Sequence, residues 1–126
     1  MEDKLIEAAQ KACKFSYSPY SNFRVGAAIL TEDNQIFTGA NVENASLGLT
    51  ICAERVAVFN ALSHGYREFK MLAVYTPTDM PVYPCGACLQ VISEFCDNLI
   101  IIIVWKQGKL RTTLRTLLTH PFRGKA

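Results

Sequence analysis

The chain has 126 residues, of which half are hydrophobic and 19% are charged, so we expect one folded domain over residues 1–126 rather than a disordered chain. A formal net charge of only +2 argues against an electrostatic nucleic-acid binder. The longest apolar run, residues 99–105, is too short to cross a membrane, and no signal peptide is visible. We therefore expect a cytoplasmic protein with neither a nucleic-acid nor a membrane partner.

The first half of the sequence predicts a helix, a hairpin and a second helix. Residues 3–14 repeat apolar side chains at helical spacing. Residues 24–30 and 35–39 are typical of two strands around a short polar turn, which makes an antiparallel hairpin. After a polar loop, residues 52–63 form a predicted helix that Gly65 can end.

The second half alternates strands with helices, which favours a central sheet covered on both faces. Residues 71–76 predict a strand and residues 86–95 a helix. Residues 99–105 form a nearly continuous apolar run, as expected of a strand buried on both sides and parallel to the one before it. Residues 109–113 follow a turn too short for a parallel connection, so they predict an antiparallel edge strand. A short helix is expected at residues 114–118.

Five cysteines, an odd number, fit poorly with a closed set of disulfides. Cys13 and Cys96 lie in apolar helical patterns and are best explained as small buried side chains. Cys52, Cys85 and Cys88 differ, because two of them are three residues apart and all three lie at predicted helix starts. In a protein without disulfides, such spacing indicates metal or redox chemistry.

The amide groups and dipole at a helix N-terminus stabilise the thiolate, which is the form of cysteine that binds metal. We therefore expect Cys52, Cys85 and Cys88 to hold one zinc ion per chain. Three protein ligands leave one position of a tetrahedral zinc site open for water, whose pKa the metal lowers. Because three thiolates give the site a negative charge, Arg55 is the expected cation that hydrogen-bonds the sulfurs.

Glu54 lies two residues after Cys52, from where it can reach a water on the metal and carry its proton. Two other interpretations of the cysteines remain open. A structural zinc site would need a fourth ligand, for which the sequence offers Cys13, Cys96, His64 and His120. A thiol-redox motif would leave the Cys52-Ala53-Glu54 segment unexplained.

Several motifs together give the chain a specific family resemblance. They are residues 17–21 (YSPYS), 23–28 (FRVGAA), 39–45 (GANVENA), 52–55 (CAER) and 84–92 (PCGACLQVI). On these motifs the sequence resembles the small, homotetrameric cytidine deaminases that bind zinc through three cysteines, a known variant of the zinc-deaminase signature. The resemblance implies an α/β fold, namely a three-layer α/β/α sandwich around a five-stranded mixed sheet, assembled as a homotetramer.

The resemblance also implies roles for individual residues. Cysteines 52, 85 and 88 would ligate zinc, with residue 54 as the proton shuttle. Asn41 and Glu43 match the positions that hydrogen-bond the ribose 3′-hydroxyl, and Phe23 matches the aromatic that packs on the pyrimidine. The backbone of Ala53 matches a contact to the base, and Phe122 a tail aromatic that reaches the active site of a neighbouring subunit.

The expected reaction converts cytidine or 2′-deoxycytidine and water to uridine or 2′-deoxyuridine and ammonia, a step of pyrimidine salvage. Glu54 would deliver a proton to ring N3 and so make C4 electrophilic. A deaminase of another cytosine-bearing compound shares the zinc site and differs at the sugar end, where Asn41 and Glu43 favour the plain nucleoside. The weak net charge argues against cytosine in nucleic acid. A zinc-stabilised binding module is the non-enzymatic alternative.

The sequence departs from the family pattern at three places. Leu89 stands where the family often has Arg, which removes a charge near the metal and gives Arg55 more of that duty. Leu47 stands where a Tyr is common, so packing between subunits is expected to differ there. The tail at residues 117–122 reads LLTHPF, which lacks the usual Leu-Leu-Pro before Phe122.

Overall fold

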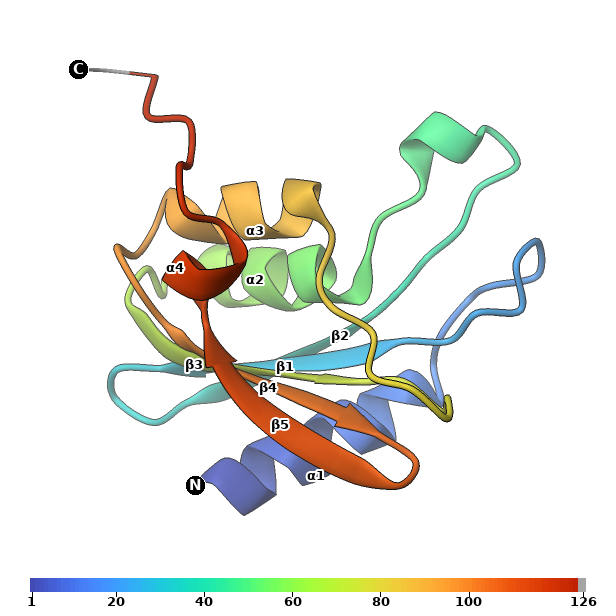
Figure 1. Cartoon of the computed structure of the whole chain (residues 1–126). Coiled ribbons are helices and arrows are strands. Elements are labelled where there is room, and N and C mark those ends of the chain that lie inside the picture. Colours follow the sequence, from blue (N-terminus) through green and yellow to red (C-terminus); the bar gives the residue numbers. More distant parts are fainter. Residues whose placement is uncertain (125–126) are drawn as a thin grey trace.

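The computed structural model describes residues 1–124, and the last two residues of the predicted domain lie outside this part. A mixed sheet forms its centre (Figure 1), and its five strands are β1 (Gly26–Thr31), β2 (Ile36–Ala40), β3 (Phe69–Tyr75), β4 (Ile100–Trp105) and β5 (Gly108–Thr113). Their order across the sheet is β2-β1-β3-β4-β5. β3 pairs parallel with β4, while the other neighbours are antiparallel. The expected hairpin, parallel pair and antiparallel edge strand are thereby confirmed.

Helices cover both faces of the sheet (Figure 1). α1 (Glu2–Cys13) lies on one face, and α2 (Ala53–Ser63), α3 (Gly86–Ser93) and α4 (Leu114–Leu117) lie on the other. The predicted three-layer α/β/α architecture is therefore confirmed. No helix within residues 1–124 is long and apolar enough to span a bilayer.

The strict alternation of side chains along a strand explains the two separate cores. In β1, Ala27 and Ile29 pack toward α2, whereas Ala28 and Leu30 pack toward α1. The same alternation runs along β4, and both faces of these strands are buried. This burial accounts for their continuous apolar sequence, because neither side of the strand meets water.

Two glycines let the outer helices approach the sheet closely. A Cβ atom at Gly26 would lie 2.0 Å from the carbonyl oxygen of Ala9 in α1. A Cβ atom at Gly39 would lie 2.4 Å from the amide nitrogen of Ala57 and 2.6 Å from the carbonyl oxygen of Ala53, both in α2. Glycine at position 39 therefore sets the position of the first turn of α2, which carries the predicted metal and proton-transfer residues.

The structure differs from the sequence prediction mainly at element ends. α3 stops two residues before the predicted end, because Glu94 and Phe95 donate their amides to carbonyls three residues back and tighten the last turn. A single 3₁₀ turn, η1 (Leu47–Leu49), was not predicted. Three residues are too few to show a hydrophobic period. The segment containing η1 projects away from the sheet (Figure 1).

Candidate active site

The N-termini of α2 and α3 bring three sulfur atoms together. Cys52 is the N-cap of α2, Cys85 is the N-cap of α3, and Cys88 lies in the first turn of α3. Their Sγ atoms all lie within 4.8 Å of one another, with 3.8 Å between Cys52 and Cys85 and 3.5 Å between Cys85 and Cys88. A tetrahedral zinc with bonds of about 2.3 Å requires sulfurs roughly 3.8 Å apart. The three thiols therefore fit one zinc ion.

The environment of Cys52 favours its negatively charged form. The pKa of its thiol is lowered to about 5, because it accepts hydrogen bonds from the Cys88 thiol and from the Arg55 guanidinium. The Arg55 Nη2 atom lies 3.5 Å from the Cys52 sulfur, and this contact raises the pKa of Arg55. The hydrogen bond to Cys52, together with burial, raises the pKa of Cys88. A divalent cation at this point would displace the remaining thiol protons.

Glu54 is buried beside the sulfurs, with a relative exposure of 5%. Burial raises the pKa of its carboxyl to about 7, and the nearby Cys52 charge acts in the same direction. A carboxyl that titrates near neutral pH can both take up and release a proton during one reaction cycle. Its side chain and Cys52 line the same cavity, so this proton exchange would take place next to the sulfurs.

The cavity has a volume of about 330 Å³ and is largely apolar, with a few polar groups in its lining. Phe23, Asn41 and Glu43 line it, as do Ala53 and Glu54, which follow Cys52 in the first turn of α2. It is completed by residues that the sequence analysis did not single out: Val25, Thr50, Ile51, Val74, Thr76, Val82 and Tyr83. A cavity of this size and character is ordinary for a small-molecule site.

Asn41 uses most of its hydrogen-bonding capacity within the chain. Its side-chain oxygen accepts from the Ser16 hydroxyl at 2.5 Å and from the Val25 amide at 3.0 Å. Its side-chain nitrogen donates to the Phe23 carbonyl at 2.7 Å, which leaves one N–H for a ligand. Asn41 therefore also holds the backbone on either side of Arg24 in place.

The Glu43 carboxylate is also fixed by hydrogen bonds within the chain, from Tyr20 and Ser21. One carboxylate oxygen accepts from the amides of Tyr20 at 3.0 Å and Ser21 at 3.1 Å, and the other accepts from the Ser21 hydroxyl. The bond from the Ser21 hydroxyl is the main reason that the Glu43 pKa is lowered. The carboxylate is thus fixed in orientation and charged, as a group that receives a hydrogen bond from a sugar hydroxyl needs to be.

Comparison with known proteins decides the family. A family model of the cytidine and deoxycytidylate deaminase zinc-binding region matches residues 1–104. The chain belongs to this deaminase family. A cytidine deaminase from Sporosarcina psychrophila is 48% identical over 122 residues, which span 95% of this chain and 90% of that protein. A probable cytidine deaminase from Dictyostelium discoideum is 44% identical over 121 residues, spanning 95% and 82% respectively.

Solved structures agree with this assignment. The crystal structure of a cytidine deaminase from Burkholderia pseudomallei superposes with a TM-score of 0.92 at 48% identity, covering 97% of this chain and 99% of that one. The zinc-binding character of the family and the geometry of the three sulfurs agree, so this deaminase carries a three-cysteine zinc site.

Among the five residues predicted to bind substrate, Phe122 alone does not line this cavity within the described chain. Its side chain is 76% exposed, and it lies in the tail after α4. The Gln90 side chain holds its backbone, donating to the Phe122 carbonyl at 2.9 Å and accepting from its amide at 3.0 Å. The predicted role in a neighbouring subunit stays a prediction.

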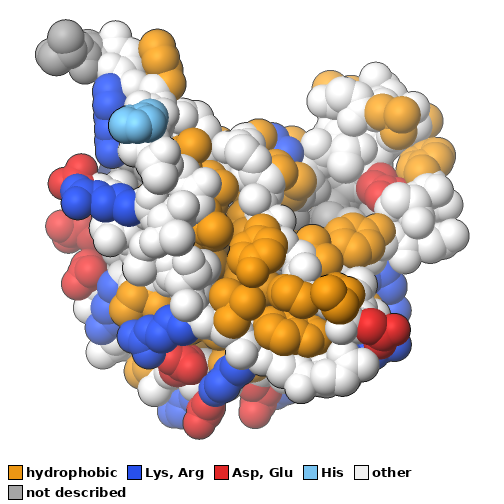
Figure 2. All heavy atoms as spheres, in the orientation of Figure 1, with side chains coloured by type: hydrophobic (Ala, Val, Ile, Leu, Met, Phe, Trp, Pro, Cys, Tyr) orange, Lys and Arg blue, Asp and Glu red, His pale blue; other side chains and the backbone are white. Residues whose placement is uncertain are grey.

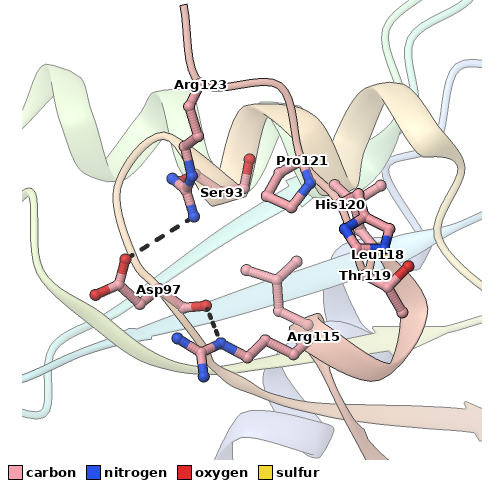
Figure 3. A pocket seen from close by; sticks show the side chains of 9 residues that line it. Ser93, Asp97, Arg115, Leu118, Thr119, His120, Pro121 and Arg123 are labelled. Atoms are coloured by element: carbon pink, nitrogen blue, oxygen red, sulfur yellow. Dashed lines mark hydrogen bonds and ion pairs between the residues drawn. The ribbon is translucent and has the colours of Figure 1, made fainter. Parts of the chain in front are cut away.

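The tail and α4 enclose a second hollow against α3 (Figure 3), with a volume of about 480 Å³. Arg123 and Arg115 both reach toward Asp97, the first at 3.9 Å from its carboxylate and the second at 3.2 Å from its carbonyl. Arg123 also donates to the Ser93 carbonyl at 2.6 Å. Both guanidinium groups therefore have hydrogen-bonding partners within the chain.

The departures from the family pattern have structural counterparts. Leu89 is buried in the core on the α2 side of the sheet, so it brings no charge to the metal site. Arg55 contacts Cys52 and has its Nε atom buried without a hydrogen-bond partner among residues 1–124. Leu47 is 71% exposed at the start of η1, a position open to contact from another molecule.

Proposed function

We propose that the chain catalyses the hydrolytic deamination of cytidine and 2′-deoxycytidine to uridine and 2′-deoxyuridine, with release of ammonia. The observation that carries this proposal is the placement of a buried carboxyl, Glu54, beside three convergent thiols, two of which line the same apolar cavity as Glu54. Membership of a deaminase family, together with a cavity suited to a nucleoside, supports the same reaction.

In this proposal Cys52, Cys85 and Cys88 are the zinc ligands, with one ion per chain. When bound, the zinc ion supplies a water that is acidic enough to react near neutral pH. Arg55 donates a hydrogen bond to the Cys52 sulfur and offsets part of the negative charge of the three thiolates.

Glu54 moves the protons. It takes one from the attacking water and delivers it to ring N3, which makes C4 electrophilic. Glu54 then takes the second proton of that water, from the hydroxyl now on C4, and hands it to the exocyclic nitrogen. The C4–N bond breaks as the C4=O bond forms, so water and the nucleoside become the uracil product and ammonia. The pKa of about 7 supports both halves of this exchange, because neither protonation state is strongly disfavoured.

Other residues of the cavity lining bind the sugar and the ring. Glu43 accepts a hydrogen bond from the 3′-hydroxyl, and the free N–H of Asn41 donates one to it. Phe23 packs on the pyrimidine, and the backbone of Ala53 contacts the base edge. The lining of the cavity by all four residues supports these assignments.

We infer further that residues 1–126 act as a single domain within a homotetramer, in which Phe122 reaches the cavity of a neighbouring subunit. Several large apolar side chains at the surface support assembly: Met80 is 71% exposed, Tyr83 50% and Leu49 64%. Figure 2 shows hydrophobic side chains gathered at the surface of one face. Cysteines that form no disulfide suit a reducing compartment, so we place the protein in the cytoplasm, where it would serve pyrimidine salvage.

An ultraviolet assay with cytidine tests the proposal directly, with metal content measured on the same sample. We expect cytidine and 2′-deoxycytidine to be converted with stoichiometric ammonia, and adenosine to be left unchanged. Zinc-loaded protein that binds cytidine but releases no ammonia would instead favour a zinc-stabilised binding module.

A further inference from the structure

The loop formed by residues 17–24, called here the 17–24 loop, links two residues of the cavity lining, Phe23 and Glu43, through one hydroxyl. Ser21 Oγ donates to one carboxylate oxygen of Glu43 and accepts from the amide of Phe23 at 3.0 Å. A serine hydroxyl has a single proton. Because that proton points to Glu43, the Ser21 oxygen is left to accept the hydrogen bond from the Phe23 amide with a lone pair.

Ser21 donates a hydrogen bond to each oxygen of the Glu43 carboxylate. Its hydroxyl bonds one oxygen, and its backbone amide lies 3.1 Å from the other, which Tyr20 also contacts. Hydrogen bonds to an ionised group are stronger than those between neutral groups. Within residues 1–124 the hydroxyl makes the sole hydrogen bond found to its carboxylate oxygen, so without the hydroxyl the carboxylate would gain rotational freedom.

Backbone hydrogen bonds fix the other residues of the loop and so fix the position of Ser21. Glu43 donates its amide to the Tyr17 carbonyl at 2.8 Å, and Tyr17 donates its amide to the Asn41 carbonyl at 2.9 Å. The Asn22 amide closes a turn onto the Ser18 carbonyl at 2.9 Å, with Asn22 in the left-handed region at a φ of 59°. Glu43 and Phe23 line the cavity, whereas Ser21 is exposed and is not part of its lining.

We propose that Ser21 is a positioning residue that sets the preference of the enzyme for nucleosides with a 3′-hydroxyl. It does so by orienting the Glu43 carboxylate before substrate arrives, which lowers the cost of ordering that group on binding. This inference rests on the proposed cytidine deamination and on Glu43 as the sugar contact. A substrate without a 3′-hydroxyl makes no bond to Glu43, so its binding is insensitive to the orientation of that carboxylate.

The test compares 2′-deoxycytidine with 2′,3′-dideoxycytidine in the zinc-loaded enzyme. For Ser21→Ala we expect KM for 2′-deoxycytidine to rise about tenfold with kcat within about twofold, a loss typical of one hydrogen bond to a charged group. The kinetics with 2′,3′-dideoxycytidine should stay unchanged. Ser21→Thr, which keeps the hydroxyl, should restore the parent KM. Ser63→Ala is the matched control, because its exposed hydroxyl bonds the Asn60 carbonyl at the end of its own helix.

An equal loss with both substrates would overturn the inference, because it would mean that Ser21 acts on the ring through Phe23 or on folding. Unchanged KM with 2′-deoxycytidine would overturn it as well. If Ser21→Ala fails to fold, Ser21→Cys serves in its place, since a thiol keeps the volume but bonds weakly. A parent enzyme that does not deaminate cytidine would instead refute the proposed function.

Discussion

Glu54 lies in surroundings that act on its charge in opposite directions. Burial and the neighbouring Cys52 raise its pKa, whereas its own backbone amide and Arg55 lower it. The resulting pKa of about 7 suits a group that exchanges protons during a reaction. A side chain that only caps a helix does not require a pKa near neutrality. At the scale of single residues, this carboxyl is where structure and chemistry meet most directly.

Glu54→Gln should abolish most turnover and leave zinc in place. Glutamine has the same shape and still hydrogen-bonds, but it cannot carry a proton, and general acid–base catalysis contributes roughly 10²–10⁴-fold to a rate. We expect kcat for cytidine to fall by about that factor, measured by ammonia release alongside zinc analysis. Glu32→Gln, at an exposed turn, is the control. A fully active Glu54→Gln enzyme would contradict the mechanism.

Arg55→Ala should keep the metal and slow the reaction. The guanidinium bonds the Cys52 sulfur at 3.5 Å, so its removal leaves the charge of the thiolates less compensated. Changes to groups that hydrogen-bond metal ligands typically cost about 10–100-fold in affinity or activity. We expect about a tenfold loss in kcat, while the exposed Arg67→Ala control stays at the parent level. Unchanged kcat would remove Arg55 from the mechanism.

At the scale of elements, the position of α2 depends on contact between backbones. Gly39→Ala would place a methyl group 2.4 Å from the Ala57 amide nitrogen, so the first turn of α2 must move. Overpacking of this kind costs about 1–3 kcal/mol. We expect denaturant unfolding to show that loss, accompanied by lower activity because Cys52 and Glu54 move with the turn.

Gly48→Ala provides the matched comparison, because nothing lies within 4 Å of a Cβ atom there. Its unfolding free energy should stay close to that of the parent chain. Equal stability of the two variants would show that α2 can shift freely, and the role assigned to Gly39 would then be wrong.

Elements and metal ligands were predictable to different degrees for physical reasons. The strands and helices follow from local periodicity, and the spacing of the cysteines in the sequence is enough to place three ligands at helix starts. The partners of Asn41 were not predictable, because Ser16 and Val25 are distant in sequence and meet it only after folding. Thr76 and Tyr83 also line the cavity, and both lie in the segment that follows the end of β3. The path of that segment depends on tertiary contacts, so no local sequence pattern predicts it.

At the scale of the whole molecule, zinc should act as a structural clamp between α2 and α3 as well as supporting the reaction. Its ligands come from both helices, and a metal that binds only the folded chain stabilises it by mass action. Chelation should therefore lower Tm and abolish turnover together, and added zinc should restore both. Cys96→Ser, whose sulfur bonds the Ile92 carbonyl, should behave like the parent in this titration. Full turnover in protein shown to lack zinc would refute this assignment.

The assembly can be tested independently of activity. Sedimentation should give four chains per particle, and Phe122→Ala should lower kcat/KM while leaving the fold of each chain intact. The exposed Phe122 ring and its backbone clamp by Gln90 support this expectation. A monomer with full activity would contradict it.

Gly26 and Gly39 stand on adjacent strands, one step apart in register, and face opposite sides of the sheet. At these two positions the backbone of the sheet approaches the backbone of α1 on one face and of α2 on the other. Where a larger side chain meets other side chains, those neighbours can change rotamer to make room. At Gly26 and Gly39 the obstructing atoms belong to the backbone, which has no such freedom. A redesign of the interior should therefore keep both glycines and vary core positions whose neighbours are side chains.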